Sequence, residues 1–159
     1  MNSRTAVALA VTTLAAAPLF AQANPRGQSE VELAGKAISV EYGRPSLKGR
    51  DMLGQADVGM TWRMGADSAT TLETAADLSF GEQAVPAGEY VLKAKKVAAE
   101  KWHLLVTSDD ATVAEVPLST SELADSVETF TIGLSGSAGK GRLEMQWGTK
   151  ALGADFSAK

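Results

Sequence analysis

Apolar and polar residues alternate along most of this 159-residue chain. The alternation begins at Val31 and Leu33, and it resumes over residues 38–42 after the turn-like stretch 34–36. It returns in six later segments, namely residues 70–74, 78–80, 90–94, 102–106, 130–134 and 143–147. A period of two places successive side chains on opposite faces of a β-strand. The pattern therefore predicts that strands dominate the chain, beginning with a two-stranded hairpin.

The segments between these predicted strands are rich in glycine, proline, serine and aspartate. They comprise residues 81–83, 86–88, 108–110 and 135–141, the last of which we interpret as a hairpin turn. Short strands at such spacing are typical of a sandwich or a barrel. We expect an all-β fold, an antiparallel β-sandwich of about seven to nine strands, formed by one domain over residues 24–159.

Two stretches depart from the alternation. Residues 43–65 carry four basic residues and five glycines, which predicts a long ordered loop. In the second stretch, residues 117–126, Ser119 is followed three positions later by Glu122. That spacing resembles a capping box, and it predicts a single helical turn as a connector.

The N-terminal residues 1–23 have the pattern of a cleavable signal peptide. Arg4 precedes an apolar run over residues 6–20, and Ala21-Gln22-Ala23 places small residues at both recognition positions. The run is shorter than the roughly 20 residues that a membrane-spanning helix needs. We expect cleavage after Ala23, a mature chain without a membrane span that starts at Asn24, and a periplasmic or secreted protein.

Charge and composition narrow the classes of partner. The chain has 19 acidic and 15 basic residues, which argues against nucleic acid as a partner. It has no cysteine and a single histidine, His103, so we expect neither a metal site of the usual nitrogen and sulfur type nor a cofactor. His103 lies between Trp102 and Leu104 on a predicted strand, and we expect it to face solvent.

Cations and aromatic residues are concentrated in one part of this otherwise acidic protein. The candidate ligand-binding residues are Tyr42, Arg44, Lys48, Arg50, Trp62, Arg63 and Asp67. Arginine can hold a carboxylate or phosphate at two points, and aromatic faces stack on sugars, so this set could bind an anionic small molecule or a glycan.

A structural interpretation of the same residues stays open. Arg44, Arg50 and Arg63 could instead pair with the carboxylates of Asp51, Asp67 or Glu41 and so hold the long loop against the sheet. We expect Arg63, which follows Trp62, to be largely buried and paired. Lys48 and Arg50, which flank a glycine, are expected to be exposed.

Three motifs in this part of the chain carry a family resemblance. They are Tyr-Gly-Arg-Pro-Ser-Leu-Lys-Gly-Arg from residue 42, Trp-Arg-Met-Gly-Ala-Asp-Ser-Ala-Thr-Thr from residue 62, and Val-Pro-Ala-Gly-Glu-Tyr-Val-Leu from residue 85. With these three motifs in this order, the chain from about residue 42 to residue 148 resembles the bacterial family known as domain of unknown function 2911. The resemblance implies an exported domain without an established activity, so it assigns no catalytic role to any residue. The family usually has asparagine where Asp67 stands.

Two functional hypotheses follow. The first is a non-enzymatic binding or interaction module of the cell envelope, whose partner is an anionic small molecule, a glycan or another envelope protein. The alternative is an envelope hydrolase or glycan-modifying enzyme that uses Asp67 or Asp51 as acid or base beside an arginine. A single carboxylate of suitable pKa is enough for such chemistry.

Overall fold

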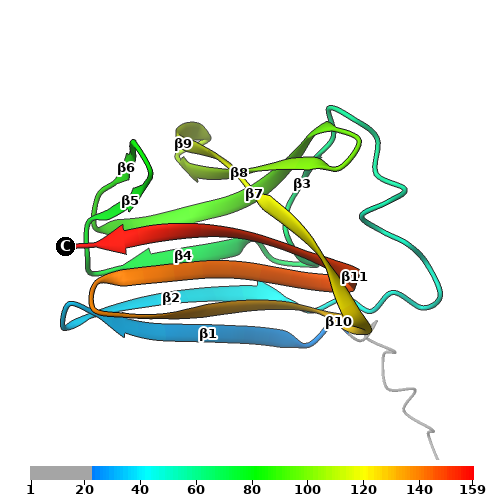
Figure 1. Ribbon diagram of the computed structural model, residues 1–159, viewed down its shortest axis with the longest axis horizontal. Helices are drawn as coiled ribbons and strands as arrows, with labels where there is room; N and C mark the ends of the chain where they lie inside the picture. The colour runs from blue at the N-terminus through cyan, green and yellow to red at the C-terminus, as the bar shows by residue number, and fades with distance from the viewer. Residues whose placement is uncertain (1–22) are drawn as a thin grey trace, which may run out of the picture.

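The computed structural model describes residues 23–159, so all of the expected signal peptide except Ala23 lies outside the described residues. The described residues form eleven strands in two antiparallel sheets and no helix (Figure 1). Within them there is no helical segment with the length and hydrophobicity to span a bilayer. The predicted all-β antiparallel sandwich is confirmed, with eleven strands where seven to nine were expected.

The larger sheet contains seven strands in the order β1-β2-β4-β7-β8-β9, with β3 paired to β7. These strands are β1 Arg26–Leu33, β2 Lys36–Gly43, β3 Thr61–Trp62, β4 Thr70–Thr74, β7 Gly88–Ala98, β8 Lys101–Ser108 and β9 Ala111–Pro117. The smaller sheet has the order β10-β11-β5-β6. Its strands are β5 Leu78–Phe80, β6 Gln83–Val85, β10 Ser119–Ser137 and β11 Lys140–Ala158.

Tight turns form where glycine follows alanine. Ala34 and Gly35 join β1 to β2 with φ angles of 53° and 71°, and Ala138 and Gly139 join β10 to β11 with 50° and 72°. Two successive positive φ angles are typical of the turn whose twist matches a β-hairpin. The predicted first hairpin and the predicted hairpin turn within residues 135–141 are confirmed.

Strand β11 doubles back on itself, so that its two halves run next to each other (Figure 1). The reversal falls at Gly148, whose φ of 63° is the left-handed conformation that glycine adopts most easily. The amide of Ala158, at the end of β11, donates at 2.8 Å to the carbonyl of Gly139, which lies in the turn just before β11 begins. Residues from distant parts of β11 therefore share one face of the smaller sheet.

The predicted helical turn at residues 117–126 is wrong. Ser119 and Glu122 lie in β10, opposite Gly153 and Lys150 of β11. The Ser119 hydroxyl donates to the Gly153 carbonyl at 3.0 Å, and Glu122 forms an ion pair with Lys150. That pairing raises the pKa of Lys150 to about 12 and lowers the pKa of Glu122. Long-range strand pairing has overridden a local capping preference.

The two sheets pack face to face through alternate side chains, and an aromatic cluster joins them. Trp62 of β3 stacks on Trp147 of β11, with ring centroids 5.4 Å apart and an interplanar angle of 14°. Phe130 of β10 meets both rings edge-on, at 5.0 and 5.5 Å. Large aromatic side chains dominate the energetics of such cores, so this cluster fixes how β3 sits on the smaller sheet.

Neighbouring edge strands protect each other at both sides of the sandwich. Strand β1 packs beside β10, and β6 packs beside β9. At the first of these edges the amide of Leu134 donates to the Ser29 hydroxyl at 2.8 Å. Covering an edge in this way limits pairing with other chains.

Gly43, the last residue of β2, provides a test of this packing. A Cβ atom there would collide with the carbonyl oxygen of Ala66, a backbone atom that cannot move without displacing the segment after β3. We expect Gly43→Ala to lower the free energy of unfolding by about 1–3 kcal/mol in urea denaturation, as overpacking usually does. Gly133 of β10 faces open space, so Gly133→Ala is the matched control and should change stability by less than about 0.5 kcal/mol. Equal denaturation midpoints for the two variants would contradict the packing of Gly43.

Candidate functional site

The aromatic members of the candidate set belong to the core. Tyr42 is buried, and its hydroxyl donates to the Ile132 carbonyl of the opposite sheet at 3.2 Å. Trp62 is half-buried in the cluster with Phe130 and Trp147. Their ring faces therefore pack against protein and contribute to the contact between the sheets.

Each of the three candidate arginines donates to a main-chain carbonyl. The pairs are Arg44 Nε with Phe130 (3.2 Å), Arg50 Nε with Leu47 (3.0 Å) and Arg63 Nη1 with Asp67 (2.8 Å). The structural interpretation named carboxylates as the partners, and in this respect it is wrong: Glu41, for example, pairs with Arg26 at 2.9 Å. Arginine holds this segment in place through backbone oxygens.

The solvent exposure of the candidate cations agrees with the prediction for two of them and differs for the third. Lys48 and Arg50 are exposed, as expected. Arg63 is also exposed, so its predicted burial is wrong. The carbonyl of Asp67 can be reached from the surface, and Arg63 therefore does not need to enter the sheet to find a partner.

The two candidate carboxylates accept backbone hydrogen bonds. The Oδ2 atom of Asp67 accepts from the amide of Asn24 at 2.8 Å, and Oδ1 of Asp51 accepts from the amide of Gly54 at 2.9 Å. Both side chains are exposed, and the main surface hollows formed by residues 23–159 include neither. A role for either residue in acid or base catalysis stays a prediction.

His103 lies on the outer face of β8, opposite to Trp102 and Leu104, as predicted. Its Nδ1 atom is 2.8 Å from Oε1 of Glu115 on β9. In the part of the chain that the structure describes, His, Asp and Glu side chains do not gather in groups of three that could hold a metal ion.

A buried lysine that sequence reasoning missed holds the long segment in place. Lys96 of β7 is 4% exposed, and its Nζ atom lies 5.7 Å from the centre of the Trp102 ring. This ammonium donates to three carbonyls, those of Leu53 (3.2 Å), Gly54 (3.3 Å) and Ala56 (2.8 Å). Position 96 continues the buried alternation of positions 92 and 94, and this was the signal that could have revealed it.

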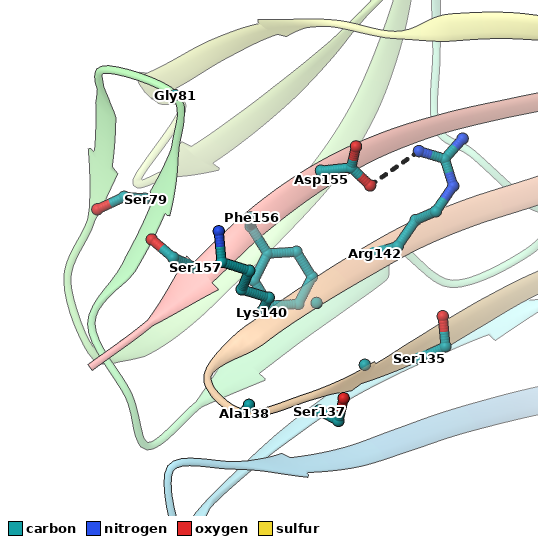
Figure 2. Close-up of a pocket in the computed structure, with 12 residues that line it drawn as sticks. Ser79, Gly81, Ser135, Ser137, Ala138, Lys140, Arg142, Asp155, Phe156 and Ser157 are labelled. Atoms are coloured by element: carbon teal, nitrogen blue, oxygen red, sulfur yellow. Dashed lines mark hydrogen bonds and ion pairs between the residues drawn. The ribbon is translucent and has the colours of Figure 1, made fainter.

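A broad hollow of about 740 Å³ lies on the outer face of the smaller sheet (Figure 2). It is formed by the end of β10, both halves of β11 and β5. Its polar lining consists of Ser79, Ser135, Ser137, Ser157, Lys140, Arg142 and Asp155. Its lining also includes the small residues Gly81, Gly136, Ala138 and Gly141. We call this hollow the serine groove.

The two cations of the serine groove differ in their electrostatic state. Arg142 is paired with Asp155 at 3.0 Å, as Figure 2 shows, and with Glu144 at 3.1 Å. The hydrogen bond to Asp155, assisted by Glu144, raises the pKa of Arg142 against the opposing effect of partial burial. Lys140 is exposed and has no ion-pair partner among the described residues. The groove therefore offers one uncompensated positive charge beside four hydroxyl groups.

Comparison with known proteins supports the resemblance found in the motifs. Residues 24–156 match the family model described as "Protein of unknown function (DUF2911)". The chain belongs to this family. The match starts at Asn24, so it spans every strand except the last residues of β11. No curated protein and no solved structure matches this chain.

The role of Lys96 in this DUF2911 domain can be tested by removing its charge. In the Lys96→Met variant three buried or half-buried carbonyls lose their donor, and we expect a loss of about 1–3 kcal/mol of unfolding free energy. Amides of residues 53–60 should exchange with deuterium faster than in the wild type. Lys95→Met, which removes the same charge on the other face of β7, should leave both measurements nearly unchanged. Equal effects of the two variants would contradict the assigned role of Lys96.

Proposed function

We propose that this DUF2911 domain is a non-enzymatic binding module of the cell envelope that holds a carboxylate-bearing saccharide in the serine groove. The observation that carries the proposal is Lys140, a cation without an acidic partner among the described residues, in a hollow that Ser135, Ser137 and Ser157 also line. The candidate set around Arg44 and Arg63 has less support as the binding site, because those donors already meet backbone carbonyls.

The chemistry of the groove favours a polyhydroxylated ligand. A serine hydroxyl can both donate and accept a hydrogen bond, which suits the hydroxyl groups of a sugar. The Lys140 ammonium only donates, so it favours a carboxylate on the ligand over another hydroxyl. Phe156 is 5% exposed, so the contacts with the sugar would be mainly polar.

The expected signal peptide over residues 1–23 supports an envelope location, in the periplasm or outside the cell. The other partner classes are a small non-sugar anion and an envelope protein. The hydrolase alternative has less support, since Asp51 and Asp67 both accept backbone hydrogen bonds and neither lies beside a main hollow.

Binding of soluble oligosaccharides tests the proposal. We expect an oligogalacturonate to bind more tightly than a neutral oligosaccharide of equal length in titration calorimetry. Lys140→Ala should weaken the binding of oligogalacturonate by about tenfold or more, because the carboxylate loses its charged donor. Ser157→Trp, which fills the groove, should abolish it.

Lys48→Ala is the matched control, because it removes an exposed cation from the original candidate set. It should bind like the wild type, and all variants should retain the wild-type melting temperature. If Lys48→Ala weakens binding and Lys140→Ala does not, the site has been placed on the wrong part of the domain. Equal affinity for the charged and neutral oligosaccharides, or no affinity for either, would contradict the proposed ligand.

A further inference from the structure

Three independent observations point to the bond between Ala23 and Asn24. The small-x-small pattern of Ala21-Gln22-Ala23 predicts cleavage at this bond. The family match begins at Asn24. Asn24 also makes the first contact of the described chain with a residue distant in sequence, through its hydrogen bond to Asp67. The predicted processing site and the start of the packed domain therefore coincide.

The segment that follows Asn24 is fixed against the rest of the domain. The carbonyl of Pro25 accepts a hydrogen bond from the amide of Arg44 at 2.8 Å. Arg26 donates to the carbonyl of Ser68 at 3.4 Å. These contacts bring the nitrogen atom of Asn24 to 2.8 Å from Oδ2 of Asp67. The position of this nitrogen is thus set by neighbouring contacts as well as by its own hydrogen bond.

We propose that processing after Ala23 turns the Asn24 amide into an α-ammonium that forms an ion pair with Asp67, a contact that the precursor has only as a neutral-donor hydrogen bond. Water cleaves the Ala23–Asn24 bond with the help of a signal peptidase: its oxygen joins the Ala23 carbonyl carbon, and the nitrogen gains hydrogen. At neutral pH the new amine takes up a further proton, because its ordinary pKa is about 7.7–8.0. A charged donor strengthens a hydrogen bond to a carboxylate.

The charges around Asp67 are compatible with this pairing. Arg63 contacts the carbonyl oxygen of Asp67 and leaves Oδ2 to Asn24. Arg26 lies near by but is paired with Glu41 at 2.9 Å. Asp67 has a φ of 63°, a conformation that aspartate tolerates better than most residues, so its backbone can hold the carboxylate in this place. The ion pair therefore needs no rearrangement of the loop.

The test uses the full precursor, exported and processed in a bacterial host. Mass spectrometry should give a mature chain that begins at Asn24. An NMR titration should then show the pKa of the Asn24 α-amine raised by about half a unit or more above its ordinary range, and Asp67→Asn should return it to that range. Asp57→Asn, which removes another exposed carboxylate, should not.

A second pair of proteins separates the ion pair from a purely structural effect of Asp67. Inserting Gly-Ser between Ala23 and Asn24 moves the new ammonium two residues away and restores the neutral amide at Asn24. Asp67→Asn should lower the melting temperature of the chain that starts at Asn24 by about 1–3 °C more than that of the extended chain. This difference should disappear as the pH rises through the raised pKa of the amine, because the stabilising charge is then lost.

Each of three results would overturn the proposal, and the first two concern the new terminus itself. One is a mature chain that begins at a residue other than Asn24. The other is an α-amine pKa that lies in the ordinary range and does not respond to Asp67→Asn. Equal losses of melting temperature in both chains would mean that Asp67 supports the loop without pairing with the new terminus, and would also overturn it.

Discussion

Residues 44–60 belong to neither sheet, apart from an isolated bridge at Ser46, yet they pack against both. Pro45 and Met60 accept hydrogen bonds from the amides of Phe130 and Lys96. The carbonyls of Leu53, Gly54 and Ala56 meet no backbone donor among the described residues, and buried carbonyls without a donor are unfavourable. The buried ammonium of Lys96 is the donor for these carbonyls, because it forms hydrogen bonds with Leu53, Gly54 and Ala56 at once. Burying a lysine is itself unfavourable unless its donors are satisfied, so the ammonium and the segment stabilise each other. The ordered conformation of residues 44–60 depends on the hydrogen bonds that the Lys96 ammonium donates to this segment.

The same constraint explains why cations gather in this region of an acidic protein. Arg50 donates to the carbonyl of Leu47, and Arg63 donates to that of Asp67. Such donors are committed to the fold and are poorly suited to capture a ligand. The serine groove differs in this respect, because Lys140 has neither a carboxylate nor a carbonyl partner among the described residues. The donors Arg50 and Arg63 thus lie outside the strands, whereas Lys140, the proposed ligand-binding cation, lies in β11 of the smaller sheet.

The regular part of the fold could be predicted from the sequence, because its strands have the simple alternation seen from residue 31 onward. Strand β9 was not predicted, because the exposed Val113 beside the buried Ala114 obscures its period of two. The reversal of β11 at Gly148 depends on pairing between segments far apart in the chain, and no local pattern indicates it. The serine groove is a product of that reversal, so its residues could not be assembled from the sequence. The motif around Arg44 led to the correct family. Its arginines, however, donate to backbone carbonyls and hold the segment in place, whereas we had considered them as ligand-binding residues.

We propose the serine groove, and not the cation-rich segment of residues 44–67, as the binding surface of this DUF2911 domain. This proposal is tested most directly by recording the amide spectrum of the ¹⁵N-labelled mature domain while oligogalacturonate is added. We expect the shift changes to concentrate on residues 135–142 and 155–157, with Ser79 and Gly81 affected as well. Shift changes concentrated on residues 44–67, with the groove unaffected, would contradict it.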